Sequence, residues 1–161
     1  LRPSKLAEDK TLSIDVVIHT IHRLIEIDRR PDAIMLLQPT TPFRKVERIK
    51  EAIKLYITDT SKSIVSFSKV ELMPEWCFRI TNEHITPILG WDKVSRRSQE
   101  IKCTYQINGS IYLASVENIL ANKSFINKST IPIIHDGFME NIDIDTECDL
   151  KKARMHLEDL K

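Results

Sequence analysis

Two aspartates near the carboxyl end of the chain have the spacing of a metal-binding pair. Asp143 and Asp145 alternate with Ile142 and Ile144, and alternation along an extended strand end places both carboxylates on one face. Two neighbouring carboxylates repel each other unless a cation or a proton lies between them. Hard oxygen ligands of this kind suit Mg²⁺ that is shared with substrate phosphates. The alternative is that Asp145 only stabilises the N-terminus of the following helix.

A glutamine and an arginine bracket a proline-stiffened segment that reads L-L-Q-P-T-T-P-F-R at residues 36–44. Gln38 follows an apolar run, and open α/β sheets bind ligands at the carboxyl ends of their strands. Its amide offers hydrogen-bond donors and an acceptor, and the Arg44 guanidinium suits a carboxylate or a phosphate. The same segment is equally consistent with a rigid connector between a strand and a helix.

Three polar segments are further candidates for binding. Arg96 and Arg97 form a pair that suits an anionic substrate, although a solvated charged loop is the commoner meaning of such a run. Residues 2–13 precede a predicted helix N-terminus, where anions are favoured, but a plain lead-in to the helix has the same composition. Asn108-Gly109 is first a turn or bulge signal and only second a binding feature.

Hydrophobic periodicity predicts the elements that must position these residues. Helices are expected in four segments: 14–25, 46–58, 116–122 and 147 onward. Ser13 is the expected cap of the first helix, and T-x-x-D at 146–149 is a variant of the capping box before the last one.

Strands are expected in four segments: 33–37, 63–70, 105–114 and 131–134. A β-hairpin joins 76–80 to 85–89. The five apolar residues at 33–37 are typical of a fully buried strand. Strand, helix and strand in succession predict an α/β fold with a mainly parallel sheet flanked by helices.

The composition is that of one ordinary globular domain. The chain has 161 residues, of which 42% are hydrophobic, and a formal net charge of +1. The near-neutral charge argues against nucleic acid as the main partner, and without a run of about 18 apolar residues no membrane span is expected. Cys77, Cys103 and Cys148 fit neither a disulfide framework nor a zinc site, which favours a reducing cytoplasm. Without an initiator Met or a signal-peptide core, the chain is expected to derive from a longer one.

Four segments in register resemble the N-acylneuraminate cytidylyltransferase family, the CMP-sialic acid synthetases. They are R-P-x-x-L-A-x-D at 2–9, L-L-Q-P-T-T-P-F-R at 36–44, N-G-x-I-Y at 108–112 and I-D-I-D-T-E-x-D-L at 142–150. The resemblance covers nearly the whole chain. It implies a Rossmann-like fold of the nucleotide-diphospho-sugar transferase type. It also implies an enzyme that uses Mg²⁺ to join CTP to a nine-carbon acidic sugar, with release of pyrophosphate.

The resemblance assigns roles to individual residues. The family binds the cytidine nucleotide at the positions of Arg2, Thr11 and Ser13. It contacts the acidic sugar at the positions of Gln38, Tyr112 and Phe125, and the sugar carboxylate through an arginine of the partner subunit at the position of Arg97. Asp143 and Asp145 match the catalytic Mg²⁺ carboxylates. Residues 74–107 correspond to an inserted dimerisation hairpin within a single domain spanning 1–161, which implies a homodimer.

Departures from the family's pattern narrow what the resemblance implies. Trp76 stands where some members have a lysine, and Thr41-Pro42-Phe43 replaces Ser-Pro-Leu, so the expected sugar is legionaminic, pseudaminic or another bacterial nonulosonic acid. The family's N-terminal strand, with its basic, glycine-containing phosphate loop, has no counterpart, so these 161 residues alone are expected to release no pyrophosphate. Two alternatives stay open: a non-catalytic, dimerising sugar-acid-binding module, and a 3-deoxy-manno-octulosonate cytidylyltransferase.

Overall fold

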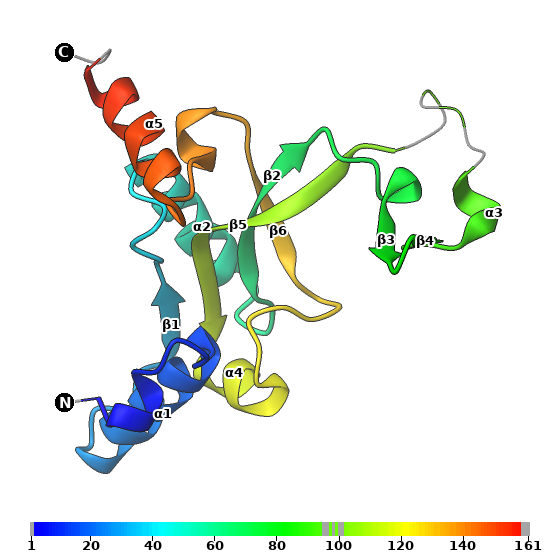
Figure 1. The fold of residues 1–161 in the computed structure, drawn as a ribbon. Coiled ribbons are helices and arrows are strands. Elements are labelled where there is room, and N and C mark those ends of the chain that lie inside the picture. The colour runs from blue at the N-terminus through cyan, green and yellow to red at the C-terminus, as the bar shows by residue number, and fades with distance from the viewer. Residues whose placement is uncertain (1, 95–96, 98, 100–101, 159–161) are drawn as a thin grey trace. The chain divides into compact units, whose positions relative to one another are not determined.

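The chain divides into two compact units. The computed structural model describes residues 2–94, 97, 99 and 102–158. One unit consists of Leu1–Phe67 and Ile107–Lys161, and the other of Ser68–Gln106. Figure 1 shows the elements of both units in chain order. Two strands, β2 (Ile64–Val70) and β5 (Thr104–Ser115), pass from one unit into the other.

A four-stranded mixed sheet organises the first unit. Its strands are β1 (Ala33–Leu36), β5, β2 and β6 (Ile131–His135), adjacent in that order. β1 and β5 are antiparallel, with Leu36 opposite Tyr112. The α/β fold expected from the sequence is confirmed. The strand between β1 and β2 is β5, whose arrow in Figure 1 points opposite to theirs.

β1 is half-buried along its whole length, so the prediction of a fully buried strand at 33–37 is wrong. The cause is its place at the edge of the described sheet, where its one neighbouring strand is β5. Ile34 and Leu36 pack toward one face of the sheet, while Ala33 and Met35 pack toward the other. Both faces of this edge strand are therefore apolar, which explains why the sequence shows no polar alternation.

Helices cover both faces of the sheet. On one face, α1 (Ser13–Glu26) and α4 (Val116–Asn122) pack over the strands. The core there consists of Val17, Ile21, Val65, Ala114, Val116, Ile119 and Phe125. On the other face lies α2 (Val46–Thr58), whose Ala52 packs with Ile64, Ile111, Leu113 and Ile133. Neighbouring residues of a strand point to opposite faces, so Ile64 and Val65 of β2 belong to different cores.

The helix ends are fixed by local hydrogen bonds, in part where the sequence predicts them. Ser13 is not the cap of α1, because Leu12 has the extended backbone of the capping position and Ser13 is the first helical residue. The capping box before α5 (Glu147–Glu158) is confirmed: the Thr146 hydroxyl donates to Asp149 at 2.7 Å and accepts from its backbone N–H at 3.3 Å. The side chain of Asp145 is thus left out of the cap.

The second unit contains the predicted β-hairpin. β3 (Phe78–Thr81) pairs with β4 (His84–Pro87) in antiparallel register. Asn82 and Glu83 both have positive φ angles, the geometry of a two-residue turn that matches the twist of its strands. The unit also holds the single-turn helices η2 (Pro74–Trp76) and α3 (Trp91–Val94). In neither unit do the described helices include one long and apolar enough to cross a membrane.

Candidate functional site

The carboxyl end of β1 and the start of α1 together line a hollow of about 330 Å³ in the first unit. Three residues expected to bind substrate meet there: Arg2, Ser13 and Gln38. Leu36, Val16 and Val17 form its apolar wall, and Pro39 and Thr40 complete the rim. The hollow therefore offers a cation and an amide beside an apolar surface, which suits the base and sugar of a nucleotide or a polar sugar.

A second hollow of about 180 Å³ adjoins the first, because Ser13, Leu36 and Gln38 line both. It brings in the two aromatic residues predicted for the sugar pocket. The rings of Tyr112, on β5, and Phe125, after α4, are tilted against each other with centroids 5.6 Å apart. Phe125 is buried and Tyr112 half-buried. An apolar wall with a hydroxyl at its edge is a surface suited to a sugar ring.

Gln38 is held between these hollows by the loop that follows β1. Arg44 donates from Nε to the carbonyl of Ser110 at 2.7 Å and from Nη2 to the carbonyl of Gln38 at 2.9 Å. Arg44 therefore ties the loop to β5, which supports the connector interpretation of this residue. The Gln38 amide lies over Gly109, where an added Cβ would come within 2.3 Å of Oε1.

Asp143 and Asp145 lie on an irregular segment beside the first hollow, and not on a strand end as predicted. The expected alternation is nevertheless present, since Ile142 is buried, Ile144 half-buried and both aspartates exposed. The backbone N–H of Ile144 donates to the carbonyl of Thr40 at 2.8 Å. That bond holds the two aspartates next to the rim residues of the hollow.

The charge of Asp143 reaches the second hollow. Burial raises the pKa of the Tyr112 hydroxyl, and the negative charge of Asp143 raises this pKa further. Within the described chain, neither Asp143 nor Asp145 has a hydrogen bond or an ion pair through its side chain. Both carboxylates are therefore available to a ligand.

The donor set fits a hard divalent cation that also binds substrate phosphates. No group of three or more His, Cys, Asp or Glu side chains that could hold a metal is found among the described residues. The described residues therefore do not form a closed structural metal site made only of protein ligands. Mg²⁺ commonly takes one or two protein carboxylates and completes its shell with phosphates and water. Asp143 and Asp145 would be the residues that hold it.

Two predicted residues are not among those that line the hollows. Thr11 is not among the residues that line them, and its hydroxyl donates to the carbonyl of Lys5 at 3.2 Å, which closes the loop before α1. Arg97 belongs to the second unit, where it is exposed. An arginine contributed by a partner subunit would have to be exposed in this way.

Sequence reasoning missed Lys123, which lines the second hollow with Phe125. Lys123 ends α4 with a left-handed backbone, at φ 48°. A non-glycine residue in this conformation is uncommon and is often found at functional sites. Left-handed helix ends are usually formed by glycine or asparagine, and a lysine at this position does not predict one. The sequence therefore carries no clear signal for Lys123.

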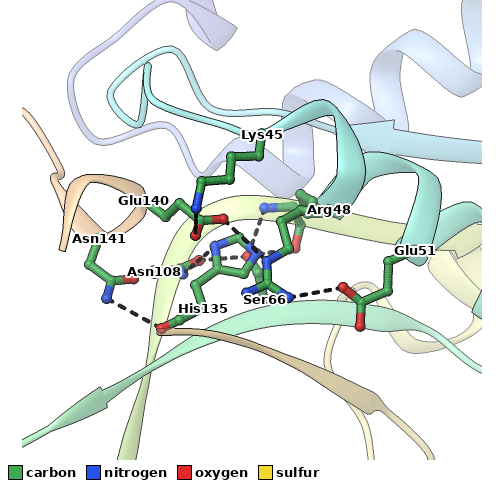
Figure 2. A network of polar contacts seen from close by, with 9 residues as sticks. Lys45, Arg48, Glu51, Ser66, Asn108, His135, Glu140 and Asn141 are labelled. Atoms are coloured by element: carbon green, nitrogen blue, oxygen red, sulfur yellow. Dashed lines mark hydrogen bonds and ion pairs between the residues drawn. The ribbon is translucent and has the colours of Figure 1, made fainter. Parts of the chain in front are cut away.

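A buried polar network was also missed (Figure 2). Glu140 is only 3% exposed and forms ion pairs with Lys45 at 2.8 Å and Arg48 at 3.2 Å. Burial alone would raise the pKa of Glu140, but the hydrogen bonds from Lys45 and Arg48 outweigh burial and lower it. Beside this group, fully buried His135 contacts Asn108 at 3.1 Å. The two residues in each of these contacts are between 27 and 95 positions apart, so no local pattern connects them.

Curated proteins with named activities align with nearly the whole chain. A CMP-N,N'-diacetyllegionaminic acid synthase of Legionella pneumophila is 39% identical over 155 residues, which are 92% of this chain and 64% of that protein. An N-acylneuraminate cytidylyltransferase of Escherichia coli is 31% identical over 95% of this chain and 35% of its own length. One from Streptococcus agalactiae is 30% identical over 98% of this chain and 37% of its own. The resemblance predicted from the four motifs is confirmed.

The chain spans between about a third and two thirds of the length of these relatives. No family model matches it. Among solved structures, a CMP:2-keto-3-deoxy-manno-octonic acid synthetase complexed with CTP superposes with a TM-score of 0.61 over 95% of this chain and 70% of that one. Since the two sequences are only 11% identical, the superposition shows a shared fold and no more.

Proposed function

We propose that this chain carries the sugar-acid pocket and the metal carboxylates of a CMP-nonulosonic acid synthetase. The enzyme would transfer CMP from CTP to a nine-carbon acidic sugar and release pyrophosphate. The observation that carries the proposal is the convergence of Gln38, Tyr112 and Phe125 on one hollow that adjoins Arg2 and Ser13. The similarity to a legionaminic acid synthase at 39% identity supports a legionaminic-type acid as the sugar.

Each part of the site has a role that follows from its chemistry. Arg2 and Ser13 would hold the nucleotide at the hollow that also contains Thr40, with Thr11 securing the loop that carries them. When bound, Mg²⁺ would neutralise charge on the phosphates and polarise the attacking oxygen. Asp143 and Asp145 would hold that ion beside the rim residues of the hollow.

The sugar acid would lie in the adjoining hollow. Gln38 would orient it by hydrogen bonds, and the rings of Tyr112 and Phe125 would form its apolar wall. Its carboxylate would meet the exposed Arg97 of a partner subunit, because a planar guanidinium can bind a carboxylate through two parallel hydrogen bonds. Lys123 adds a second cation on the wall of the same hollow.

Pyrophosphate release tests the proposal directly. The intact protein that carries this chain is incubated with CTP, Mg²⁺ and, in turn, N,N'-diacetyllegionaminic acid, N-acetylneuraminic acid and 3-deoxy-manno-octulosonate. We expect release above background with a nine-carbon acid and the highest kcat/KM for the legionaminic one. Release only with the eight-carbon acid would contradict the sugar assignment, and binding of an acid without release would indicate a non-catalytic module.

Removal of Gln38 or Arg97 should mainly raise the KM for the sugar acid. Hydrogen bonds to a charged group contribute about 1.5–3 kcal/mol, which corresponds to roughly a 10- to 150-fold change in affinity. We therefore expect Gln38→Ala and Arg97→Ala to raise this KM at least tenfold while the KM for CTP changes little. Steady-state kinetics with each substrate varied in turn measures both values.

Arg29→Ala is the matched control for Arg97, since Arg29 is an exposed arginine outside residues 74–107 that lines neither hollow. It should leave both KM values unchanged. If Gln38→Ala and Arg97→Ala raise the KM for CTP instead, the assignment of the two hollows must be exchanged.

We also propose that residues 74–107 mediate a homodimer. The second unit exposes large apolar side chains: Ile80 of β3 is 74% and Trp91 of α3 is 61% accessible to solvent. An apolar surface of this kind is typical of an interface between subunits. Light scattering of the intact protein at micromolar concentration should give the mass of a dimer, and Ile80→Glu should shift it toward the monomer.

Ile57→Glu is the control for the dimer prediction. Ile57 is as exposed as Ile80, at 70%, but lies on α2 of the first unit, so this variant should remain dimeric. A monomeric wild type would contradict the proposal.

The three cysteines are free thiols, in keeping with a proposed cytoplasmic location, where disulfides are rare.

A further inference from the structure

Three neighbouring strands each contribute one buried polar side chain to the network in Figure 2. Ser66 lies on β2, Asn108 on β5 and His135 at the end of β6, and β2 is the middle strand of the three. Adjacent strands are about 4.8 Å apart, so residues on β5 and β6 meet only over a small residue on β2. Ser66 is small enough for Asn108 Nδ2 and His135 Nδ1 to approach to 3.1 Å.

A backbone donor fixes the orientation of the Asn108 amide in this network. The N–H of Ser110 donates to Asn108 Oδ1 at 3.1 Å, which identifies that atom as the amide oxygen. The Ser66 hydroxyl accepts from the N–H of Ile111 at 2.8 Å and donates to the same oxygen at 2.5 Å. The amide nitrogen of Asn108 therefore faces His135, and Nδ1 of the imidazole must be an acceptor.

An acceptor at Nδ1 means a neutral imidazole whose proton is on Nε2. If Nδ1 were protonated, two donors would face each other, and Asn108 could only turn its oxygen to His135 by losing the bonds to Ser66 and Ser110. Four charged groups surround the ring: Glu140 from η4 (Met139–Asn141) and Lys45, Arg48 and Glu51 from α2 or its start. Burial is the largest influence and lowers the pKa of His135, so the neutral form is favoured.

The bond from Ser110 to Asn108 forms a turn around Gly109, whose φ is +72°. A side chain that binds the backbone two residues ahead stabilises this kind of turn. Against this turn lies Gln38, whose Oε1 occupies the space that a Cβ on Gly109 would need. The Gln38 amide therefore packs directly against the Gly109 peptide, in space that the missing side chain leaves open.

We propose that His135 is a positioning residue for the sugar-acid pocket: through Asn108 it holds the Gly109 turn that carries Gln38. This inference rests on the proposed function only in naming the sugar acid as the ligand of Gln38. His135 itself touches no substrate in this arrangement, since it is fully buried on the strand farthest from β1. Its contribution is a hydrogen-bond acceptor at one defined point.

The test compares two substitutions in the intact protein. His135→Leu removes the acceptor, whereas His135→Asn can place its Oδ1 near the position of Nδ1 and so retain it. We expect His135→Leu to raise the KM for the sugar acid about tenfold, the effect of one lost hydrogen bond, without a comparable change for CTP. His135→Asn should restore most of the difference.

Hydrogen exchange of the Ser110 amide gives a readout that needs no substrate. Its protection factor should fall about tenfold in His135→Leu and stay near the wild-type value in His135→Asn. Thr130→Val is the control: it removes a hydroxyl that contacts Ser63 at 2.8 Å just before β6, and it should change neither Ser110 protection nor the sugar KM.

If His135→Leu does not fold, lowering the pH of the wild type removes the acceptor in its place, and Ser110 protection can still be compared with that of His135→Asn. Below the usual titration range of histidine, Nδ1 of the wild type becomes a donor and Ser110 should lose protection, whereas His135→Asn should keep it. Wild-type protection in His135→Leu, an equal loss in both variants, or an unchanged sugar KM would overturn the inference. If the wild type releases no pyrophosphate with any acid, the proposed function fails, while Ser110 exchange still decides whether His135 holds the turn.

Discussion

Asp145→Asn should leave the fold intact and reduce pyrophosphate release by about a thousandfold or more. The loss corresponds to about 4 kcal/mol of transition-state stabilisation, the scale expected when a metal that neutralises phosphate charge is no longer held. Folding should survive because Asp145 is exposed, makes no hydrogen bond within the described chain and takes no part in the cap of α5. Initial rates of release over a range of Mg²⁺ concentrations, together with a circular dichroism melt, measure the two effects.

Asp149→Asn is the matched control for this prediction. It makes the same change four residues later, where the carboxylate accepts from the Thr146 hydroxyl and the Lys152 ammonium at the start of α5. The control should lower the melting temperature and leave turnover nearly unchanged. Near-normal activity of Asp145→Asn at every Mg²⁺ concentration would remove the metal role from this residue.

The other carboxylate offers a readout independent of turnover. Because the charge of Asp143 raises the pKa of the Tyr112 hydroxyl, Asp143→Asn should lower that pKa toward its ordinary value. Burial would keep it raised in part. An NMR titration of the Tyr112 ring in both proteins therefore checks that Asp143 lies beside the second hollow.

The sequence predicted the elements well where the signal is local. The bounds 46–58 and 116–122 agree with α2 and α4, since one apolar stripe per helix is enough to define them. The turn between β3 and β4 follows from Asn82, which tolerates a positive φ. The T-x-x-D pattern specified the box that begins α5, because both partners lie within four residues.

Long-range pairing explains what the sequence did not reveal. Nothing in residues 33–37 indicates that residues of β5, which lie 76 to 82 positions later, pair with them and leave β1 at the edge of the sheet. The start of α1 was predicted one residue too late. Leu12 takes the extended backbone of the capping position although its side chain forms no capping hydrogen bond. Ser13 does not cap the helix and instead lines both hollows.

In the candidate site, too, local motifs were recognisable in the sequence and long-range contacts were not. The motifs pointed to Gln38 and Asp143 individually, and the structure places their segments side by side through the bond between Ile144 and Thr40. His135 and Glu140 carry no motif, because a buried polar residue is recognisable only once its partners are known. Asn108 was interpreted first as a turn or bulge signal and second as a binding feature, whereas its amide joins three strands.

Gly109→Ala should raise the KM for the sugar acid about as much as Gln38→Ala does, roughly tenfold. The new methyl group would lie 2.3 Å from Oε1 of Gln38, while the other nearby atoms, at 3.5 and 3.6 Å, are at ordinary contact distance. A flexible amide can swing away from such a contact, so the displacement costs little stability but removes the group proposed to bind the sugar. The positive φ of 72° adds a backbone penalty of about 1–2 kcal/mol.

A double-mutant cycle and a second glycine separate these two effects. Gly90→Ala introduces a comparable backbone strain, at φ +95°, next to Asp92 of α3. It should lower the free energy of unfolding about as much as Gly109→Ala but leave the sugar KM unchanged. In a Gln38→Ala background, Gly109→Ala should add no further increase in KM, because the side chain that it displaces is gone. Additive effects of the two substitutions would mean that Gly109 influences the pocket by a route other than Gln38, and the proposed link from the buried network to the sugar would then lose its last step.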